Sequence, residues 1–263
     1  MGSATREAVA AAKAAIAARP SAATLAVGEE LFSAGRAIGG SAQLLGALTD
    51  PSAGAKEKAR LVDSVFSSLG DESRSLLTGL AQSRWSEASD FLFGVEELGL
   101  RVMASSAESG VDIPAELFAF GQLVGTNAEL ELAVGSKLGD PSAKAALIAS
   151  LLGGRASDQT IAIVSHLVQQ PLGRRIGALL ASAADIVADQ SGLAVATVTV
   201  ASRLDDGQVD RLRAALAKTY GELRINQIID PDIIGGVRVA VASDVIDDTV
   251  ATRLKELKLQ LVG

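Results

Sequence analysis

Apolar residues recur at spacings of three and four along most of the chain, up to about Asp189. Such a pattern puts one apolar stripe on a helix, which then packs that stripe against its neighbours. Residues 172–189 show the pattern most fully. The same pattern predicts helices over residues 3–18, 22–38 and 42–48, and around the apolar sets 61–66, 76–80 and 91–102. A second series of helices that looks like the first is expected to follow and to end in the helix over residues 172–189.

The pattern changes at Gly192. Residues 194–200 read Ala-Val-Ala-Thr-Val-Thr-Val, and β-branched residues in near alternation are typical of a strand. A helix is expected after Asp205, then strands over 223–229 and 235–242, and a last helix over about 248–261. This order predicts a small α/β module of βαββα type.

The expected fold class is therefore mainly α. Residues 1–108 are expected to form an N-terminal helical bundle, and residues 109–190 a second helical block. Residues 191–263 are expected to form the C-terminal α/β domain.

The two helical blocks resemble each other, with matches about 86–90 residues apart, which indicates an internal duplication. Two Ala/Leu-rich stretches can also align through composition alone, so the matched helix starts carry most weight. The matching pairs are Glu30-Leu31-Phe32 with Glu116-Leu117-Phe118, Asp50-Pro51-Ser52 with Asp140-Pro141-Ser142, Leu61-Val62 with Leu147-Ile148, and Leu76-Leu77 with Ile163-Val164.

Acidic residues stand where several helices are expected to begin. Asp50-Pro51 predicts an N-cap followed by proline at the first helical position. The doublets Asp205-Asp206 and Asp247-Asp248 could bind a divalent cation, but both precede expected helices, where carboxylates accept hydrogen bonds from free N–H groups. Helix capping is the favoured interpretation, and Asp247 is expected to cap the last helix.

Composition excludes several classes of function. The net charge of −7 and the 3% of aromatic residues argue against a general nucleic-acid binder. The chain has no cysteine, so it has no disulfide or thiolate metal site. The most apolar stretch, around 176–200, is interrupted by Asp185 and Asp189, and a span needs about 20 predominantly apolar residues. Any membrane link is therefore expected to run through partner proteins.

Catalytic groups are scarce. His166, the only histidine, lies within an expected helix, and no serine lies on a nucleophile turn. No catalytic residue, cofactor or metal is therefore expected. Trp85 could anchor an interface, but a half-buried core position is favoured. Arg174 and Arg175 lie off the apolar stripe and are expected to be solvated. A structural connector within a larger machine and a helical adaptor binding partner helices both remain open.

The segment from Leu223 onward distinguishes these two classes. It contains Asp230-Pro231, then Ile234-Gly235-Gly236, then Val245-Ile246-Asp247, followed by an Arg-Leu helix. This combination resembles the C-terminal signature of the delta subunit of bacterial F-type ATP synthases, the oligomycin-sensitivity-conferring protein family. The added helical block resembles the longer actinobacterial form. The chain departs from the family pattern at two positions. Asp248 stands where the family usually has a glycine, and Ala242 stands in place of the usual glycine before the turn, so the geometry of these loops is expected to differ.

The resemblance implies a non-catalytic peripheral-stalk subunit in a hetero-oligomer at the cytoplasmic face of the cell membrane. Its helical domain would hold N-terminal helices of the ATP synthase alpha subunits, and its C-terminal part would join the b-type stalk subunits. The eight signature residues would be structural, since turns need a fixed proline φ and permissive glycines.

Overall fold

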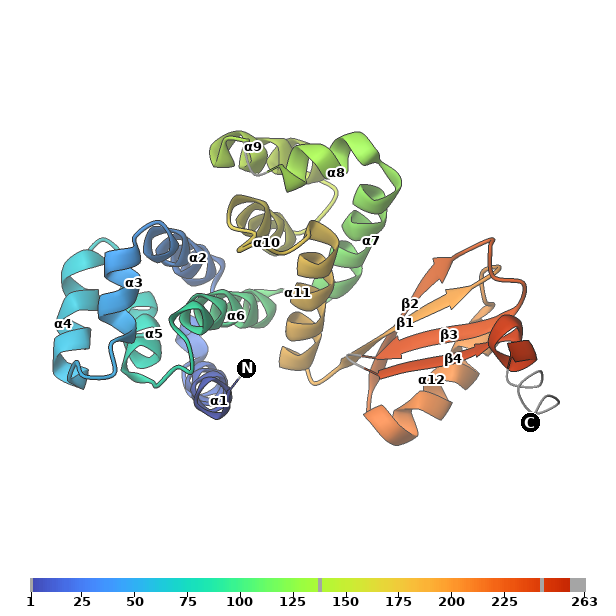
Figure 1. Cartoon of the computed structure of the whole chain (residues 1–263), viewed down its shortest axis with the longest axis horizontal. Coiled ribbons are helices and arrows are strands. Elements are labelled where there is room, and N and C mark those ends of the chain that lie inside the picture. Colours follow the sequence, from blue (N-terminus) through green and yellow to red (C-terminus); the bar gives the residue numbers. More distant parts are fainter. Residues whose placement is uncertain (1, 137–138, 242–243, 256–263) are drawn as a thin grey trace. The chain divides into compact units, whose positions relative to one another are not determined.

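The computed structural model describes residues 2–136, 139–241 and 244–255, and it divides into two compact units, Met1–Val187 and Ala188–Gly263. The first is helical and the second combines a sheet with helices, so the expected fold class is confirmed (Figure 1). No described helix has the length and apolar character that a membrane crossing requires.

The first helical block runs from the N-terminus to α6. Hydroxyl caps fix two of its helix starts: the Thr24 side chain accepts from Val27 N–H, and that of Ser41 accepts from Leu44 N–H. Its elements are α1 (Ser3–Ala17), the 3-10 turn η1 (Pro20–Ala22), α2 (Leu25–Gly39), α3 (Ala42–Thr49), α4 (Ala55–Val65), α5 (Asp71–Gln82) and α6 (Ala88–Ser106). One core fills this block and includes Leu31, Ile38, Leu48, Val62, Leu77, Phe91 and Val95.

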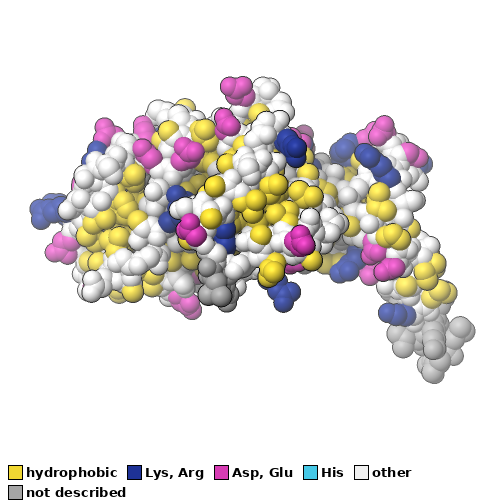
Figure 2. All heavy atoms as spheres, turned by 90° about the horizontal axis from the view of Figure 1, so that it is seen from above, with side chains coloured by type: hydrophobic (Ala, Val, Ile, Leu, Met, Phe, Trp, Pro, Cys, Tyr) yellow, Lys and Arg dark blue, Asp and Glu magenta, His cyan; other side chains and the backbone are white. Residues whose placement is uncertain are grey.

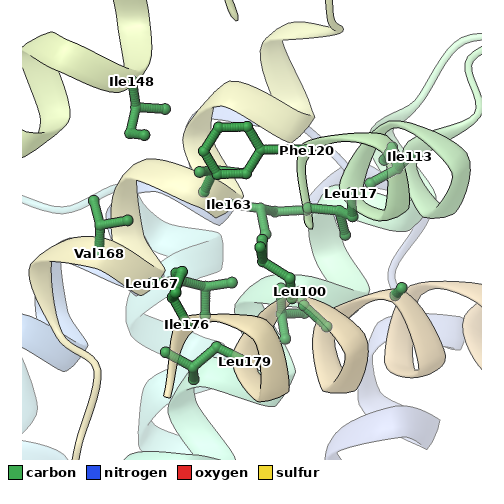
Figure 3. Close-up of a cluster of buried hydrophobic side chains, with 14 of the residues drawn as sticks. Leu100, Ile113, Leu117, Phe120, Ile148, Ile163, Leu167, Val168, Ile176 and Leu179 are labelled. Carbon is green, nitrogen blue, oxygen red and sulfur yellow. The ribbon is translucent and has the colours of Figure 1, made fainter. Parts of the chain in front are cut away.

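The second block reuses α6 and adds α7 (Ile113–Thr126), α8 (Ala128–Gly135), α9 (Pro141–Leu152), α10 (Asp158–Gln169) and α11 (Ile176–Gln190). Its core is separate from the first. Figure 3 shows side chains from α6, α7, α9, α10 and α11 converging there, among them Leu100, Leu117, Phe120, Ile148, Ile163, Leu167 and Leu179. α6 therefore closes one block and opens the next.

Equivalent glutamates cap equivalent helix starts in the two blocks. The Glu30 carboxylate on α2 accepts hydrogen bonds from Gly70 N–H and the Ser73 hydroxyl, at the start of α5. In the second block, the Glu116 carboxylate on α7 accepts from Ser157 N–H at 3.1 Å and from the Thr160 hydroxyl at 2.5 Å, at the start of α10. Two long-range caps of one geometry support the internal duplication.

One matched pair is not equivalent. Asp140 caps α9, with Pro141 at the first helical position, as the sequence predicts. The prediction for Asp50 is wrong: α4 begins only at Ala55, after Gly54, and the Asp50 carboxylate accepts from Ser52 N–H in the preceding turn. An Asx-type turn competes there with helix initiation.

The C-terminal unit is a four-stranded sheet in the order β2-β1-β3-β4, with α12 against it (Figure 1). β1 and β2 are parallel and joined through α12, since a parallel pair needs a crossover connection. β3 and β4 are antiparallel. The elements are β1 (Ala194–Val200), α12 (Asp206–Tyr220), β2 (Leu223–Ile229), β3 (Gly236–Val241) and β4 (Asp244–Thr249).

Sequence and structure agree closely in this unit, with one addition. The bounds of β1 and β2 match the prediction, and Asp205 caps α12 in a reciprocal pair with Gln208. The structure adds β4, which the sequence pattern treats as a connection. The expected turn at Ala242-Ser243 and the last helix beyond Lys255 lie outside the described residues.

Candidate functional site

The signature Asp230-Pro231 forms the turn that ends β2. The Asp230 backbone N–H donates to the carbonyl of Val200, the last residue of β1, at 2.9 Å. Its carboxylate accepts from Asp232 N–H at 3.0 Å. Pro231 has no N–H, so it ends the strand without leaving a donor unpaired. These residues build the turn.

Gly235 and Gly236 bring the chain back into the sheet. The Gly235 carbonyl accepts from Val250 N–H at 3.0 Å. Gly236 has φ +86°, and a Cβ there would collide with the Asp248 carbonyl and lie 2.8 Å from Thr249 Cα. Only glycine fits such a conformation at so close an approach.

Asp247 does not cap the last helix. Its carboxylate accepts from Thr249 N–H at 3.1 Å, while Thr249 itself caps the helix by accepting from Thr252 N–H. The hydrogen bonds from Thr249 lower the pKa of the Asp247 carboxyl group. Asp247 therefore fixes the end of β4, two residues before the capping residue Thr249.

Three signature side chains are apolar and exposed. Ile234 is 81% exposed in the turn before β3, and Val245 and Ile246 on the edge strand β4 are 54% and 46% exposed. A sheet edge with apolar side chains invites pairing with another chain. These three residues are the apolar side chains of the signature that lie exposed, whereas its aspartates, proline and glycines shape the backbone.

The helical unit holds a second candidate site, a hollow of about 130 Å³ between α1 and α5. Small side chains line most of it. The lining residues are Ala8, Ala11, Ala12, Ala15, Arg19, Ser75, Leu76, Gly79, Leu80, Ser83 and Leu98. Apolar cavities of about 150 Å³ accept a benzene ring, so this hollow suits one bulky side chain. Figure 2 shows other apolar side chains that reach the surface of the molecule.

The pair α6 and α10 in the second block is covered instead by α2. The Phe32 ring on α2 stacks on the His166 ring of α10, with centroids 4.2 Å apart. It also lies so close to Gly99 on α6 that no side chain would fit there. The Gln170 amide donates to the carbonyl of Gly35 on α2 at 3.0 Å. α2 is thus bound between both helices.

A buried ionic cluster lies beside this contact. Glu96 is 6% exposed, and its carboxylate accepts from the Arg174 guanidinium at 2.6 Å. His166 Nε2 is 3.7 Å from the same carboxylate, too far for a hydrogen bond, and no other partner satisfies it. Burial lowers the pKa of His166. Burial alone would raise the pKa of Glu96, but His166 and Arg174 outweigh it and lower that pKa.

Arg174 and Trp85 both make specific contacts in the helical unit. Arg174 is not simply solvated: besides Glu96, its guanidinium lies 4.9 Å from the centre of the Phe93 ring. Trp85 is half-buried, as expected. Its indole N–H donates to the Leu80 carbonyl, and its ring packs edge-on against the Phe91 ring. His166 has no serine partner, and no cluster of potential metal ligands occurs among the described residues.

Comparisons with known proteins agree with the signature. The family model "ATP synthase delta (OSCP) subunit" matches residues 100–261, which span the second helical block and the C-terminal unit. Relatives named ATP synthase subunit delta extend the match to the whole chain. The protein of Leifsonia xyli subsp. xyli is 52% identical over 263 residues, with 100% of both chains covered.

Two further relatives are more distant. The subunit delta of Streptomyces griseus subsp. griseus is 39% identical over 271 residues, and that of Arthrobacter sp. is 33% identical over 276 residues, each covering 100% of both chains. These are actinobacterial proteins that share the added N-terminal block, as the sequence predicts. The chain belongs to the ATP synthase delta (OSCP) subunit family, a family of non-catalytic subunits.

Proposed function

We propose that this chain is the connector at the top of the peripheral stalk of an F-type ATP synthase. The helical unit would hold N-terminal helices of the alpha subunits, and the C-terminal unit would join the b-type stalk subunits. The chain would then belong to a hetero-oligomer and lie peripherally at the cytoplasmic face of the cell membrane, held there by its partners.

The observation that carries this proposal is the α1–α5 hollow. A hollow of one ring's size between two helices, lined by small side chains, fits helix-in-groove recognition by an apolar anchor. At the other end of the chain, exposed Ile234, Val245 and Ile246 offer an apolar edge for a second partner. Two separate apolar surfaces on different units are what a connector requires.

The physical role follows from torque. A rotor turning inside the catalytic head would carry the head with it unless the head were fixed to the stalk. Several modest contacts within one assembly raise the effective concentration of each contact, so that none has to be tight. The separate cores of the two helical blocks support the proposed division at residues 1–108, 109–190 and 191–263, with α6 contributing to both.

The test is purification of the intact synthase from the membranes of cells that carry a tagged copy of this chain. We expect alpha and b-type subunits to co-purify with it. Recovery of the chain in the soluble fraction, with neither subunit, would favour the helical adaptor instead.

A further inference from the structure

A lysine is buried at the same place in each helical block. Lys58 is the fourth residue of α4 and Lys144 the fourth residue of α9, and they are 6% and 7% exposed. Their surroundings match. The Gln82 amide donates to the first carbonyl of α4 at 3.2 Å, and the Gln169 amide donates to the first carbonyl of α9 at 3.3 Å. The two lysines are therefore equivalent positions of the duplication.

The two ammonium groups differ in what they contact. Lys144 Nζ donates to the carbonyl of Val168 at 3.5 Å and to that of Ser136, so it ties the α8–α9 connection to the end of α10. Within the part of the chain that the structure describes, no atom accepts a hydrogen bond from Lys58 Nζ. Burial lowers the pKa of Lys58, because its ammonium loses hydration that no acceptor replaces. Lys58 therefore keeps three donors unused.

These donors open onto a hollow of about 820 Å³ at the start of α6, the Lys58 hollow. Lys58 lines it, and its ammonium is not among the fully enclosed polar atoms, so a ligand can reach it there. Arg84 and the half-buried Trp85 form another wall. The Glu87 side chain does not cap α6, so the positive end of this 19-residue helix also lies at the hollow.

The charges around the hollow favour an anion. Among its described lining residues, Arg84 is the second cation, and Asp50 and Glu87 are the carboxylates. Asp50 Oδ1 is already occupied, since it accepts from Ser52 N–H at 2.8 Å and from the Ser52 hydroxyl at 2.6 Å. The side-chain charges balance, and the end of α6 adds partial positive charge. An anion would supply the acceptor that the Lys58 ammonium lacks.

We infer that the first helical block binds an oxyanion at Lys58, in the hollow at the start of α6. The ligand is a small molecule with a phosphate or carboxylate group, whose oxygens accept from the Lys58 ammonium and from the free N–H groups of α6. The volume of the hollow is of the size that small-molecule sites have. Lys144 cannot play this part in the second block, because backbone carbonyls hold its ammonium. The site does not depend on the connector role.

Trp85 provides the readout, because it is the only tryptophan of the chain and lines the Lys58 hollow. The full chain is titrated with sodium phosphate and, separately, with sodium acetate, while sodium chloride keeps the ionic strength constant. We expect a saturable change in Trp85 emission. Saturation by phosphate alone identifies a phosphate group as the ligand, and saturation by acetate identifies a carboxylate. No change with either salt beyond that in sodium chloride would overturn the assignment.

Two variants test the role of the lysine. Lys58→Met removes the charge and keeps a long, adaptable side chain at the buried position. The matched control is Lys56→Met, an exposed lysine of the same helix that does not line the hollow. We expect Lys58→Met to weaken binding at least about tenfold and Lys56→Met to bind as wild type. Equal binding by the two variants would refute a site at Lys58.

Thermal unfolding followed by circular dichroism gives a readout that does not depend on Trp85. A ligand that binds only the folded chain raises the midpoint. Phosphate also stabilises proteins without binding to a site, so the three proteins are compared at the same phosphate concentration. We expect a smaller rise in Lys58→Met than in Lys56→Met and the wild type. Equal rises would overturn the assignment, and the wild-type titration decides alone should Lys58→Met not fold.

Discussion

At the scale of single residues, Gly236 shows how a signature residue acts through the backbone. Its φ of +86° and the nearby Asp248 carbonyl exclude any side chain. Gly236→Ala should therefore lower the free energy of unfolding of the C-terminal unit by more than the cost of a strained backbone position, about 1–3 kcal/mol, because the Asp248 carbonyl must also move away from the added Cβ. Urea denaturation followed by circular dichroism measures this change.

Gly192→Ala is the control for this prediction. Gly192 has φ +75°, but nothing lies within 4 Å of an added Cβ. Gly192→Ala should lower the free energy of unfolding only by the cost of placing an alanine in the left-handed backbone region, about 1–2 kcal/mol. Equal losses in the two variants would show that the contact with Asp248 does not matter.

His166 gives a prediction about pH. Burial lowers its pKa in the folded protein, so the unfolded chain binds more protons as the pH falls, and stability falls with it. The lowered pKa of Glu96 has the same sign, but its stabilising contribution is lost only below about pH 5, as the pH falls past the ordinary pKa of a glutamate. The free energy of unfolding should therefore decrease from about pH 7 to about pH 5, around the ordinary pKa of histidine.

His166→Gln isolates the histidine contribution. The variant keeps a polar side chain near Glu96 but cannot gain a proton in this range. We expect a flatter dependence of the unfolding free energy on pH between about 7 and 5 than in the wild type. Curves of equal slope would assign the acid sensitivity to other groups.

At the scale of elements, the long-range caps stabilise the helix starts. Thr160 is fully buried, so Glu116→Ala leaves its hydroxyl without its acceptor. The expected loss is about 1–3 kcal/mol of unfolding free energy, and Glu30→Ala should cost a similar amount because Ser73 is equally buried. Thermal unfolding of both variants tests this.

Glu129→Ala is the matched control, because Glu129 is an exposed glutamate in the first turn of α8. Such a surface change is expected to stay within about 0.5 kcal/mol. A loss as large as that of Glu116→Ala would mean that removal of negative charge, and not the cap, is responsible.

The elements also show what a sequence can predict. β1 and the Asp205 cap were predictable because their signals are local: alternating β-branched residues and a carboxylate three residues before Gln208. The role of Glu116 was not, since its partners at Ser157 and Thr160 lie far along the chain. Arg174 was misread for the same reason, because Glu96 lies on another helix.

The edge strand β4 shows a different limit. Its residues are mostly exposed and include three aspartates, which are depleted in strands. β4 is held by its antiparallel pairing with β3, and the strand propensities of its own residues do not predict that pairing. The α1–α5 hollow could not be predicted from the sequence either, because alanines on one helix leave a hollow only where the facing helix also carries small side chains.

At the scale of the helical unit, Phe32 joins the two blocks, since it lies on α2 of the first and is buried in the core of the second. The blocks should therefore unfold together. Trp85 is the only tryptophan and lies in the first block, so its fluorescence reports on that block alone, whereas circular dichroism reports on all helices. In the wild type we expect the two signals to give one midpoint for the helical unit.

Phe32→Ala should break this coupling. Removing a buried phenylalanine costs about 3–5 kcal/mol, and here the loss falls on the contact between blocks. Phe66→Ala is the control, because Phe66 is 5% exposed and packs only in the first core. We expect separate midpoints in Phe32→Ala and, in Phe66→Ala, a lower midpoint that the two signals share. Coincident signals in Phe32→Ala would mean that α6, which contributes to both cores, is sufficient to couple them.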